Sequence, residues 1–347
     1  FSTEDRQPLV MTRFRDPSGG DGVPVVLVHG LGQNRFTWHL SRASMAEYLA
    51  CRGFDVFVPE LRGHGLSREA GSVHPAGFSE YVYSDVPAIL REVRKLSGGQ
   101  QVFYCGHSLG GTIGYALDPA EQAHLRGIVF LSAPFDFCKG LCALRALCWS
   151  LVKAHRYTPL RAVEMVDRRT PFFIDLVGKG ISMGLPLHDS RLNLSPYRLW
   201  EPGSMDRDVL EERVRCGFDR TSLQVMKMIT LWTGTGRLLD EKFGESYERN
   251  LKGKNVPALF VAADADRIVP EQSIRPAFYM MPSPDKTWKL FGKKEHGVRF
   301  GHLDLVTGRA AQRTVWPYVA GWMGQRAVRS QKSGARSQKD RWPIADG

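Results

Sequence analysis

The segment Gly106-His107-Ser108-Leu109-Gly110 carries the clearest structural signal in this chain of 347 residues. It matches the pattern G-x-S-x-G, in which a serine lies on a sharp turn between a strand and a helix. Residues 101–105 before it predict a short buried strand, and residues 111–116 after it can begin a helix. Glycines two positions to either side allow neighbouring backbone to approach the strained turn closely. We therefore expect the Ser108 hydroxyl to stand above a sheet, at the positive end of a helix, where a developing anion is stabilised.

A second turn lies upstream, after the apolar, β-branched run at 25–28. An unbroken apolar run that is too short for a helix is typical of a buried parallel strand. The segment His29-Gly30-Leu31-Gly32 follows, and a turn in this position can supply an N–H donor to the reacting group. We predict that the backbone N–H groups of Leu31 and Leu109 form an oxyanion hole. His29 is expected to hold the loop, not to carry protons.

The order of these motifs resembles that of the α/β-hydrolases over residues 12–323. Residues 53–67, which read GFDVFVPELRGHGLS, are similar to the family's strand and its D-x-R-G-H-G-x-S loop. Glu60 replaces the usual aspartate there, a change that concerns the structure of the loop and not the chemistry. Residues 127–134 predict another buried strand, in the family's order. The resemblance implies an α/β fold with a mostly parallel, doubly wound sheet and a helical cap insertion.

The resemblance also implies an acid and a histidine that follow Ser108 in that order along the chain. The acid is expected at the end of a late strand, which residues 256–263 predict. Asp266 follows in a segment similar to the family's G-x-x-D-x-I-V-P pattern, with alanine where glycine is common. Its carboxylate would accept the Nδ1–H of the histidine and fix the tautomer of the ring. Asp264, which also suits a loop cap, and Asp136, at a position that some members use, are the alternatives.

Two histidines follow the last predicted strand, at 287–291. His302 lies in the segment GHLD, just before a helical pattern, as in several lipase-like and polyester-synthase-like members of the family. His296 ends the charged run KKEH, which is typical of a solvated loop. We therefore predict that His302 is the general base and that His296 is a surface residue.

The insertion at 135–250 is too long for a simple crossover and lacks strand-like runs, so it predicts a helical cap or lid. Residues 1–134 and 251–325 would form the hydrolase core. Apolar residues are frequent in the insertion and are densest at 141–154. Most of them would form the core of the cap. A cap rich in Leu, Met and Phe is nevertheless better suited to an acyl chain than to a charged substrate.

Together these features predict a serine esterase or lipase that cleaves small hydrophobic carboxylic esters through an acyl-enzyme on Ser108. An acyltransferase or polyester synthase on the same scaffold is an alternative, although polyester synthases generally carry a cysteine nucleophile. A ligand-binding member with low turnover is another. The mechanism needs no cofactor and no metal, and Cys138, Cys142 and Cys148 lack C-x-x-C spacing.

The net charge of +11 is concentrated in part at 326–347, which predicts a basic, disordered tail. Such a tail could make weak contact with anionic surfaces. Its aromatic residues are not interleaved with the basic ones, so we expect no nucleic-acid partner.

The sequence contains no run of about 18 apolar residues, so it predicts no membrane span. Six scattered cysteines favour reduced thiols and a cytoplasmic setting, although a chain that begins with Phe1 is compatible with a removed leader. The oligomeric state is left open.

Overall fold

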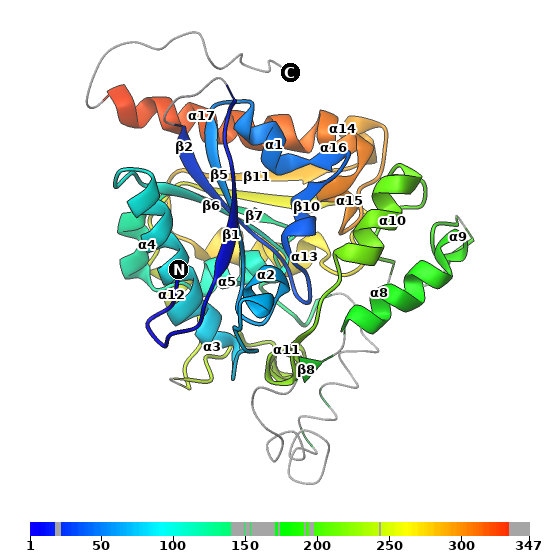
Figure 1. Cartoon of the computed structure of the whole chain (residues 1–347), viewed down its shortest axis with the longest axis horizontal. Coiled ribbons are helices and arrows are strands. Elements are labelled where there is room, and N and C mark those ends of the chain that lie inside the picture. Colours follow the sequence, from blue (N-terminus) through cyan, green and yellow to red (C-terminus); the bar gives the residue numbers. More distant parts are fainter. Residues whose placement is uncertain are drawn as a thin grey trace.

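The computed structural model describes residues 1–17, 22–139, 149, 153, 171–172, 174–190, 192–193, 198–242 and 244–332. Its centre is a seven-stranded sheet with the strand order β1-β5-β2-β6-β7-β10-β11 (Figure 1). The strands are β1 (Val10–Phe14), β2 (Val23–Val28), β5 (Phe54–Glu60), β6 (Val102–His107), β7 (Leu125–Leu131), β10 (Ala258–Ala263) and β11 (Lys286–Phe291). β1 is antiparallel to β5, and the other neighbours are parallel. The mostly parallel α/β sheet that the family resemblance implied is confirmed.

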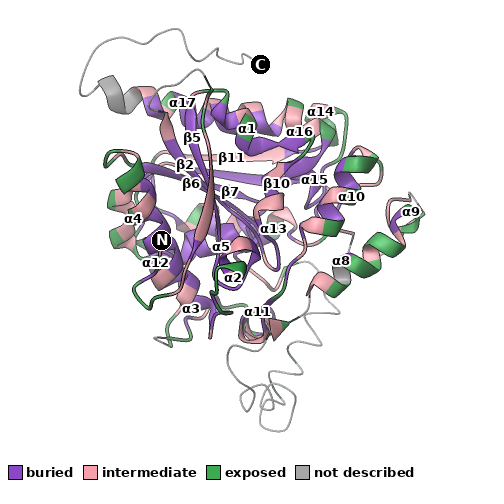
Figure 2. Cartoon of the chain, viewed as in Figure 1, coloured by how far each residue is buried: buried purple, intermediate pink, exposed green. Residues whose placement is uncertain are grey.

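Helices cover both faces of this sheet, so its central strands are buried on both sides (Figure 2). In β2, Val26 and Val28 contribute to one core, while Val25 and Leu27 contribute to the core on the opposite face. This alternation explains the unbroken apolar run, because successive side chains of a strand point to opposite faces. The first core includes residues of α4 (Val86–Leu96), α5 (Leu109–Ala116), α12 (Glu248–Lys252) and α13 (Glu271–Met280), and the second includes residues of α1 (Met45–Ala50), α16 (Arg309–Arg313) and α17 (Val315–Lys332).

Shorter elements connect these layers. They are the strands β3 (His39–Leu40) and β4 (Ala43–Ser44), the helices α2 (Gly65–Glu69), α3 (Phe78–Glu80), α14 (Lys293–His296) and α15 (Asp304–Thr307), the 3-10 helices η1 (Arg35–Thr37) and η3 (Pro119–His124), and the π-helical turn η2 (Tyr81–Asp85). None of the described helices combines the length and the apolar character that crossing a membrane requires.

The insertion that we expected to form the cap is largely helical where it is described. It contains β8 (Pro171–Phe172), α8 (Ile174–Met183), α9 (Leu185–His188), α10 (Arg207–Cys216), β9 (Thr221–Ser222) and α11 (Leu223–Thr235). The antiparallel pair β8–β9 was missed, because strands of two residues are too short to produce a hydrophobic pattern. Apart from Trp149 and Lys153, the apolar stretch 141–154 lies outside the described residues.

The predicted boundary of the basic tail is wrong at its start, because α17 continues to Lys332. The Arg326 guanidinium pairs with the Asp285 carboxylate and lies 3.9 Å from the centre of the Trp322 ring. Ala327, one residue later, is buried. These tertiary contacts stabilise the end of the helix, although its sequence there has no apolar periodicity that would predict it. Residues 333–347 lie outside the described part of the chain.

Candidate active site

Ser108 lies on a strained turn between β6 and α5, in the setting that its pentapeptide predicted. Its backbone angles are φ 53° and ψ −121°, which L-residues rarely adopt. Its N–H donates to the carbonyl of Leu131 on the neighbouring strand (2.9 Å). A Cβ atom at Gly106 would overlap the backbone of Gly110, and one at Gly110 would overlap the carbonyl oxygen of Val28. Gly106 therefore allows α5 to approach the end of β6, and Gly110 allows the turn to pack against the end of β2.

His302 and Asp266 form a buried pair, although they are 36 residues apart in the sequence. The Nδ1 atom of His302 lies 2.7 Å from Oδ2 of Asp266, and the two side chains are 4% and 0% exposed. The other carboxylate oxygen of Asp266 accepts the backbone N–H groups of Ile268 (2.9 Å) and Val269 (2.7 Å). Asp266 is thus oriented by the loop after β10, and its Oδ2 is directed at the His302 ring.

The His302 ring packs against His107, the residue that precedes Ser108. The two imidazole ring centroids are 4.6 Å apart, and Nε2 of His107 donates to the main-chain oxygen of His302 (3.1 Å). Among the described residues, no hydrogen bond joins the Ser108 hydroxyl to the His302 ring. Such bonds between catalytic groups often tighten only when substrate binds. The structure therefore gathers Ser108, His302 and Asp266 in one region.

The other two candidate acids have separate structural roles. Asp264 accepts the backbone N–H groups of Lys293 (2.9 Å) and Phe300 (3.0 Å), as expected of a loop cap. Oδ1 of Asp136 accepts the N–H of Cys138 (2.9 Å). Of the three carboxylates, Asp266 alone is hydrogen-bonded to a histidine among the described residues. The geometry therefore favours Asp266 over both alternatives.

His296 is half-buried, where we predicted a surface residue. Its ring stacks on Phe291, with the ring centroids 5.0 Å apart and an interplanar angle of 19°. Desolvation by this packing lowers the pKa of the His296 imidazole. The charged run around it conceals the contact, because Phe291 belongs to the preceding strand.

His29 and Glu60 hold the loops after β2 and β5. Nδ1 of His29 donates to the carbonyl of Gly30 (2.9 Å), and Nε2 accepts the N–H of Leu61 (3.2 Å). Burial lowers the pKa of the His29 ring, which favours this neutral, structural state. The Glu60 carboxylate accepts the N–H groups of Arg35 (3.0 Å) and Leu66 (2.7 Å). Both residues organise loops, in agreement with the sequence interpretation.

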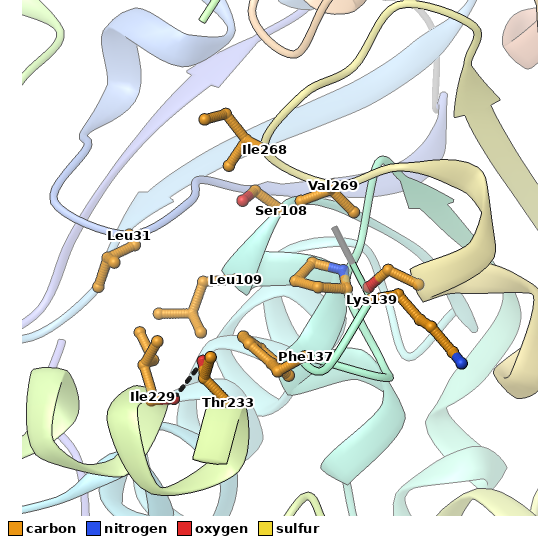
Figure 3. A pocket seen from close by; sticks show the side chains of 11 residues that line it. Leu31, Ser108, Leu109, Phe137, Lys139, Ile229, Thr233, Ile268 and Val269 are labelled. Carbon is orange, nitrogen blue, oxygen red and sulfur yellow. Dashed lines mark hydrogen bonds between the residues drawn. The ribbon is translucent and has the colours of Figure 1, made fainter. Parts of the chain in front are cut away.

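Ser108 opens onto a pocket of about 250 Å³ (Figure 3). Leu31 and Leu109, whose N–H groups we expected to form the oxyanion hole, both line it. Neither N–H donates a hydrogen bond to another described residue. A Cβ atom at Gly30 would lie 3.1 Å from that of Ser108, so the loop after β2 comes close to the serine. The remaining lining residues are Pro134, Phe137, Lys139, Ile229, Thr233, Ile268, Val269 and Ser273.

The polar side chains of this pocket, Ser108 and Lys139 apart, are already hydrogen-bonded. The Thr233 hydroxyl donates to the carbonyl of Ile229 (2.8 Å), and the Ser273 hydroxyl donates to the carbonyl of Asp136 (2.9 Å). Figure 3 shows the Lys139 amine directed away from Ser108. The pocket is therefore apolar in character next to the Ser108 hydroxyl. Sequence analysis placed Ser108, Leu31 and Leu109 at the reaction site, but it did not assign the other lining residues to a pocket, because they come from separate elements.

A buried cation of α10 also lies within electrostatic range of this region. Arg213 is 1% exposed, and its guanidinium has neither a hydrogen bond nor an ion pair with a described residue. Desolvation lowers the pKa of Arg213 to about 10, so the group stays charged at neutral pH. Desolvation, with added repulsion from His302 and Arg213, lowers the pKa of His107 well below its ordinary value. Within the described ranges, no group of three or more His, Cys, Asp or Glu side chains could hold a metal ion.

Comparisons with known proteins agree with this architecture. The chain is 35% identical to Triacylglycerol lipase 2 of Arabidopsis thaliana over 28% of its length, and 27% identical to gastric triacylglycerol lipase of Rattus norvegicus over 59%. These matches span 25% and 50% of the relatives' own lengths. The crystal structure of a monoacylglycerol lipase from Paleococcus ferrophilus has the same fold, with a TM-score of 0.58 and 20% identity, covering 92% of this chain and 99% of that one. The family model of the alpha/beta hydrolases matches residues 25–284. The chain therefore belongs to the alpha/beta hydrolase family.

Proposed function

We propose that this protein hydrolyses hydrophobic carboxylic esters through an acyl-enzyme on Ser108. The observation that carries the proposal is the buried Asp266–His302 pair, packed beside the strained turn that presents Ser108. A serine on such a turn, a histidine and a carboxylate that orients the ring are the parts that acyl transfer requires. The names of the relatives, which include triacylglycerol lipases, support an ester substrate.

In this mechanism the Ser108 hydroxyl attacks the ester carbonyl carbon while Nε2 of His302 takes its proton. The Asp266 carboxylate stabilises the imidazolium that forms. The N–H groups of Leu31 and Leu109 donate to the developing oxyanion, and one such donor contributes about 3 kcal/mol to the barrier reduction. His302 then protonates the departing alcohol, and it later activates the water that releases the acid and regenerates the serine.

The apolar pocket supports the choice of a hydrophobic substrate. An acyl chain would meet Leu31, Leu109 and the Ile229 side chain of α11, and the Thr233 hydroxyl is already hydrogen-bonded. A charged or hydroxylated chain would lose its water there without gaining a partner, and this is unfavourable. Because Ile229 and Thr233 belong to the insertion, we further propose that residues 135–250 act as a cap that supplies part of the substrate site.

The test combines a fluorophosphonate probe with p-nitrophenyl esters of increasing chain length. The native protein is expected to be labelled and to hydrolyse the esters, and the Ser108→Ala variant to do neither. Absence of labelling in the native protein would contradict the proposal and favour a ligand-binding member. Labelling with slow hydrolysis that added alcohol accelerates would favour an acyltransferase.

The base is tested by a matched pair of variants. His302→Ala is expected to lose at least 1,000-fold in kcat, as removal of a triad member does elsewhere, while His296→Ala retains activity within about threefold. Equal residual activity in the two variants would contradict the assignment of His302.

A further inference from the structure

A second cavity, of about 390 Å³, lies apart from the Ser108 pocket and shares no lining residue with it. Its walls come from the loop before α10, the end of α14 with the loop that follows, the start of α15, and α16. In Figure 1, α14, α15 and α16 lie together near the beginning of α17. The proposed hydrolysis uses no residue of this cavity, so its composition needs a separate explanation.

Three arginines border the cavity, namely Arg299, Arg309 and Arg313. Arg309 is paired, since its guanidinium donates to the Asp206 carboxylate (2.9 Å) and to the carbonyl of Gly203 (2.5 Å). Arg299 and Arg313 are exposed, and neither has an ion pair with a described residue. Two guanidinium groups from different elements thus border one cavity, and neither has a counter-ion in the part of the chain that the structure describes.

The neighbouring carboxylates do not neutralise these two groups. Asp304, which also lines the cavity, is buried and accepts the backbone N–H groups of Gly301 (3.1 Å) and Glu201 (3.2 Å). Burial raises the pKa of Asp304 to about 7, so much of its charge is absent near neutral pH. Glu201 pairs with Arg198 (3.5 Å). Glu295, on α14, pairs with Lys289. The cavity therefore has an excess of positive charge.

We propose that this cavity binds a phosphate group, either as inorganic phosphate or as the phosphomonoester of a small molecule. Guanidinium groups bind phosphate through paired N–H donors, and its oxygens can serve two arginines at once, whereas a carboxylate offers only two oxygens. The volume exceeds that of a phosphate ion, which leaves room for a small organic part. Phe300 and Asp304, which flank His302 in the sequence, form part of the wall, so the ligand stabilises the loop that carries His302.

The test measures binding of inorganic phosphate and of glycerol 3-phosphate at pH 7 by calorimetry and thermal shift, with sodium chloride at equal ionic strength as reference. Both the native protein and Ser108→Ala are expected to bind, which separates this proposal from the proposed hydrolysis. Stronger binding of glycerol 3-phosphate would identify a phosphomonoester as the ligand, and equal or stronger binding of phosphate would identify the free ion.

Variants locate the site. The double variant Arg299→Ala/Arg313→Ala is expected to weaken phosphate binding at least about tenfold, because each charge-assisted guanidinium contact is strong. The double variant Arg299→Lys/Arg313→Lys is expected to weaken binding less, since it keeps the charge but loses the paired N–H donors. Arg52→Ala/Lys95→Ala removes the same charge from exposed positions elsewhere and should bind like the native protein. Failure of the native protein to bind either ligand beyond the chloride reference would overturn the proposal, as would unchanged affinity in the double alanine variant.

Discussion

Asp266→Asn is the substitution whose effect the geometry determines most directly. Oδ1 of Asp266 accepts two backbone N–H groups, from Ile268 and Val269, and Oδ2 faces Nδ1 of His302 at 2.7 Å. In the variant, the amide oxygen must keep the position that accepts the two N–H donors, because an NH₂ group there would face donors only. The amide NH₂ therefore points at Nδ1 of His302.

That orientation reverses the tautomer of the histidine. Nδ1 must accept a hydrogen bond from the amide, so the proton moves to Nε2, the atom that should take the proton of Ser108. The wrong tautomer at the corresponding position of a serine protease reduces kcat by about 10⁴-fold, equivalent to roughly 5 kcal/mol in the barrier, and we expect a loss of that order here. Stability should change little, since the variant retains both backbone hydrogen bonds.

The assay is kcat for p-nitrophenyl ester hydrolysis between pH 6 and 9, together with the thermal unfolding midpoint. Asp264→Asn is the matched control, because it alters a nearby carboxylate that accepts N–H groups from Lys293 and Phe300. The control is expected to retain kcat within about threefold and to lose roughly 1 kcal/mol of stability through weaker capping. A folded Asp266→Asn variant with kcat within tenfold of the native protein would refute this reasoning.

Three further predictions concern packing and charge. Gly110→Ala is expected to lose activity and at least about 3 kcal/mol of stability, because the added Cβ would overlap the carbonyl oxygen of Val28. Calorimetry measures the unfolding midpoint of the variant, and a midpoint equal to that of the native protein would contradict the prediction. Arg213→Met should raise the free energy of unfolding in urea by about 1–4 kcal/mol, since it replaces a buried cation that has no counter-ion among the described residues. A loss of stability would show that the charge is compensated. Burial, with repulsion from His29, lowers the pKa of His64 to about 3 in the folded protein. As the pH falls below about 6.5, His64 therefore binds more protons in the unfolded chain than in the folded one. The free energy of unfolding should therefore fall as the pH drops from 6.5 toward 3, and His64 contributes up to about 1.4 kcal/mol per pH unit to this fall. His64→Gln should show a shallower fall. Equal slopes in the two proteins would contradict the assignment.

Much of the architecture could be predicted because the relevant signals are local. The apolar runs that became β2, β6, β7 and β10 are short and unbroken, as strands covered on both faces must be. The positive φ of Ser108 was foreseeable from its two glycines, since only the absence of side chains at 106 and 110 lets β2 and α5 approach the turn. The predictions that were wrong concern the start of the tail, the absence of strands in the insertion and the exposure of His296. Each depends on a packing contact that the local sequence pattern does not show, such as that of the His296 ring with Phe291.

The sequence by itself therefore determined the parallel strands of the sheet, the turn at Ser108 and a short set of candidate acids and bases, whereas the antiparallel edge strand β1 was not predicted. Only the tertiary structure shows that Asp266, the acid we expected, is hydrogen-bonded to His302, whereas Asp264 accepts backbone N–H groups of a loop. The two carboxylates are two residues apart on one loop, and each is oriented by the backbone N–H groups that it accepts. Likewise, the support that His107 gives to His302, and the arginines gathered around the second cavity, depend on where separate loops meet. Such contacts leave no periodic or compositional trace, because they join residues that are distant in the sequence and close only in the folded chain.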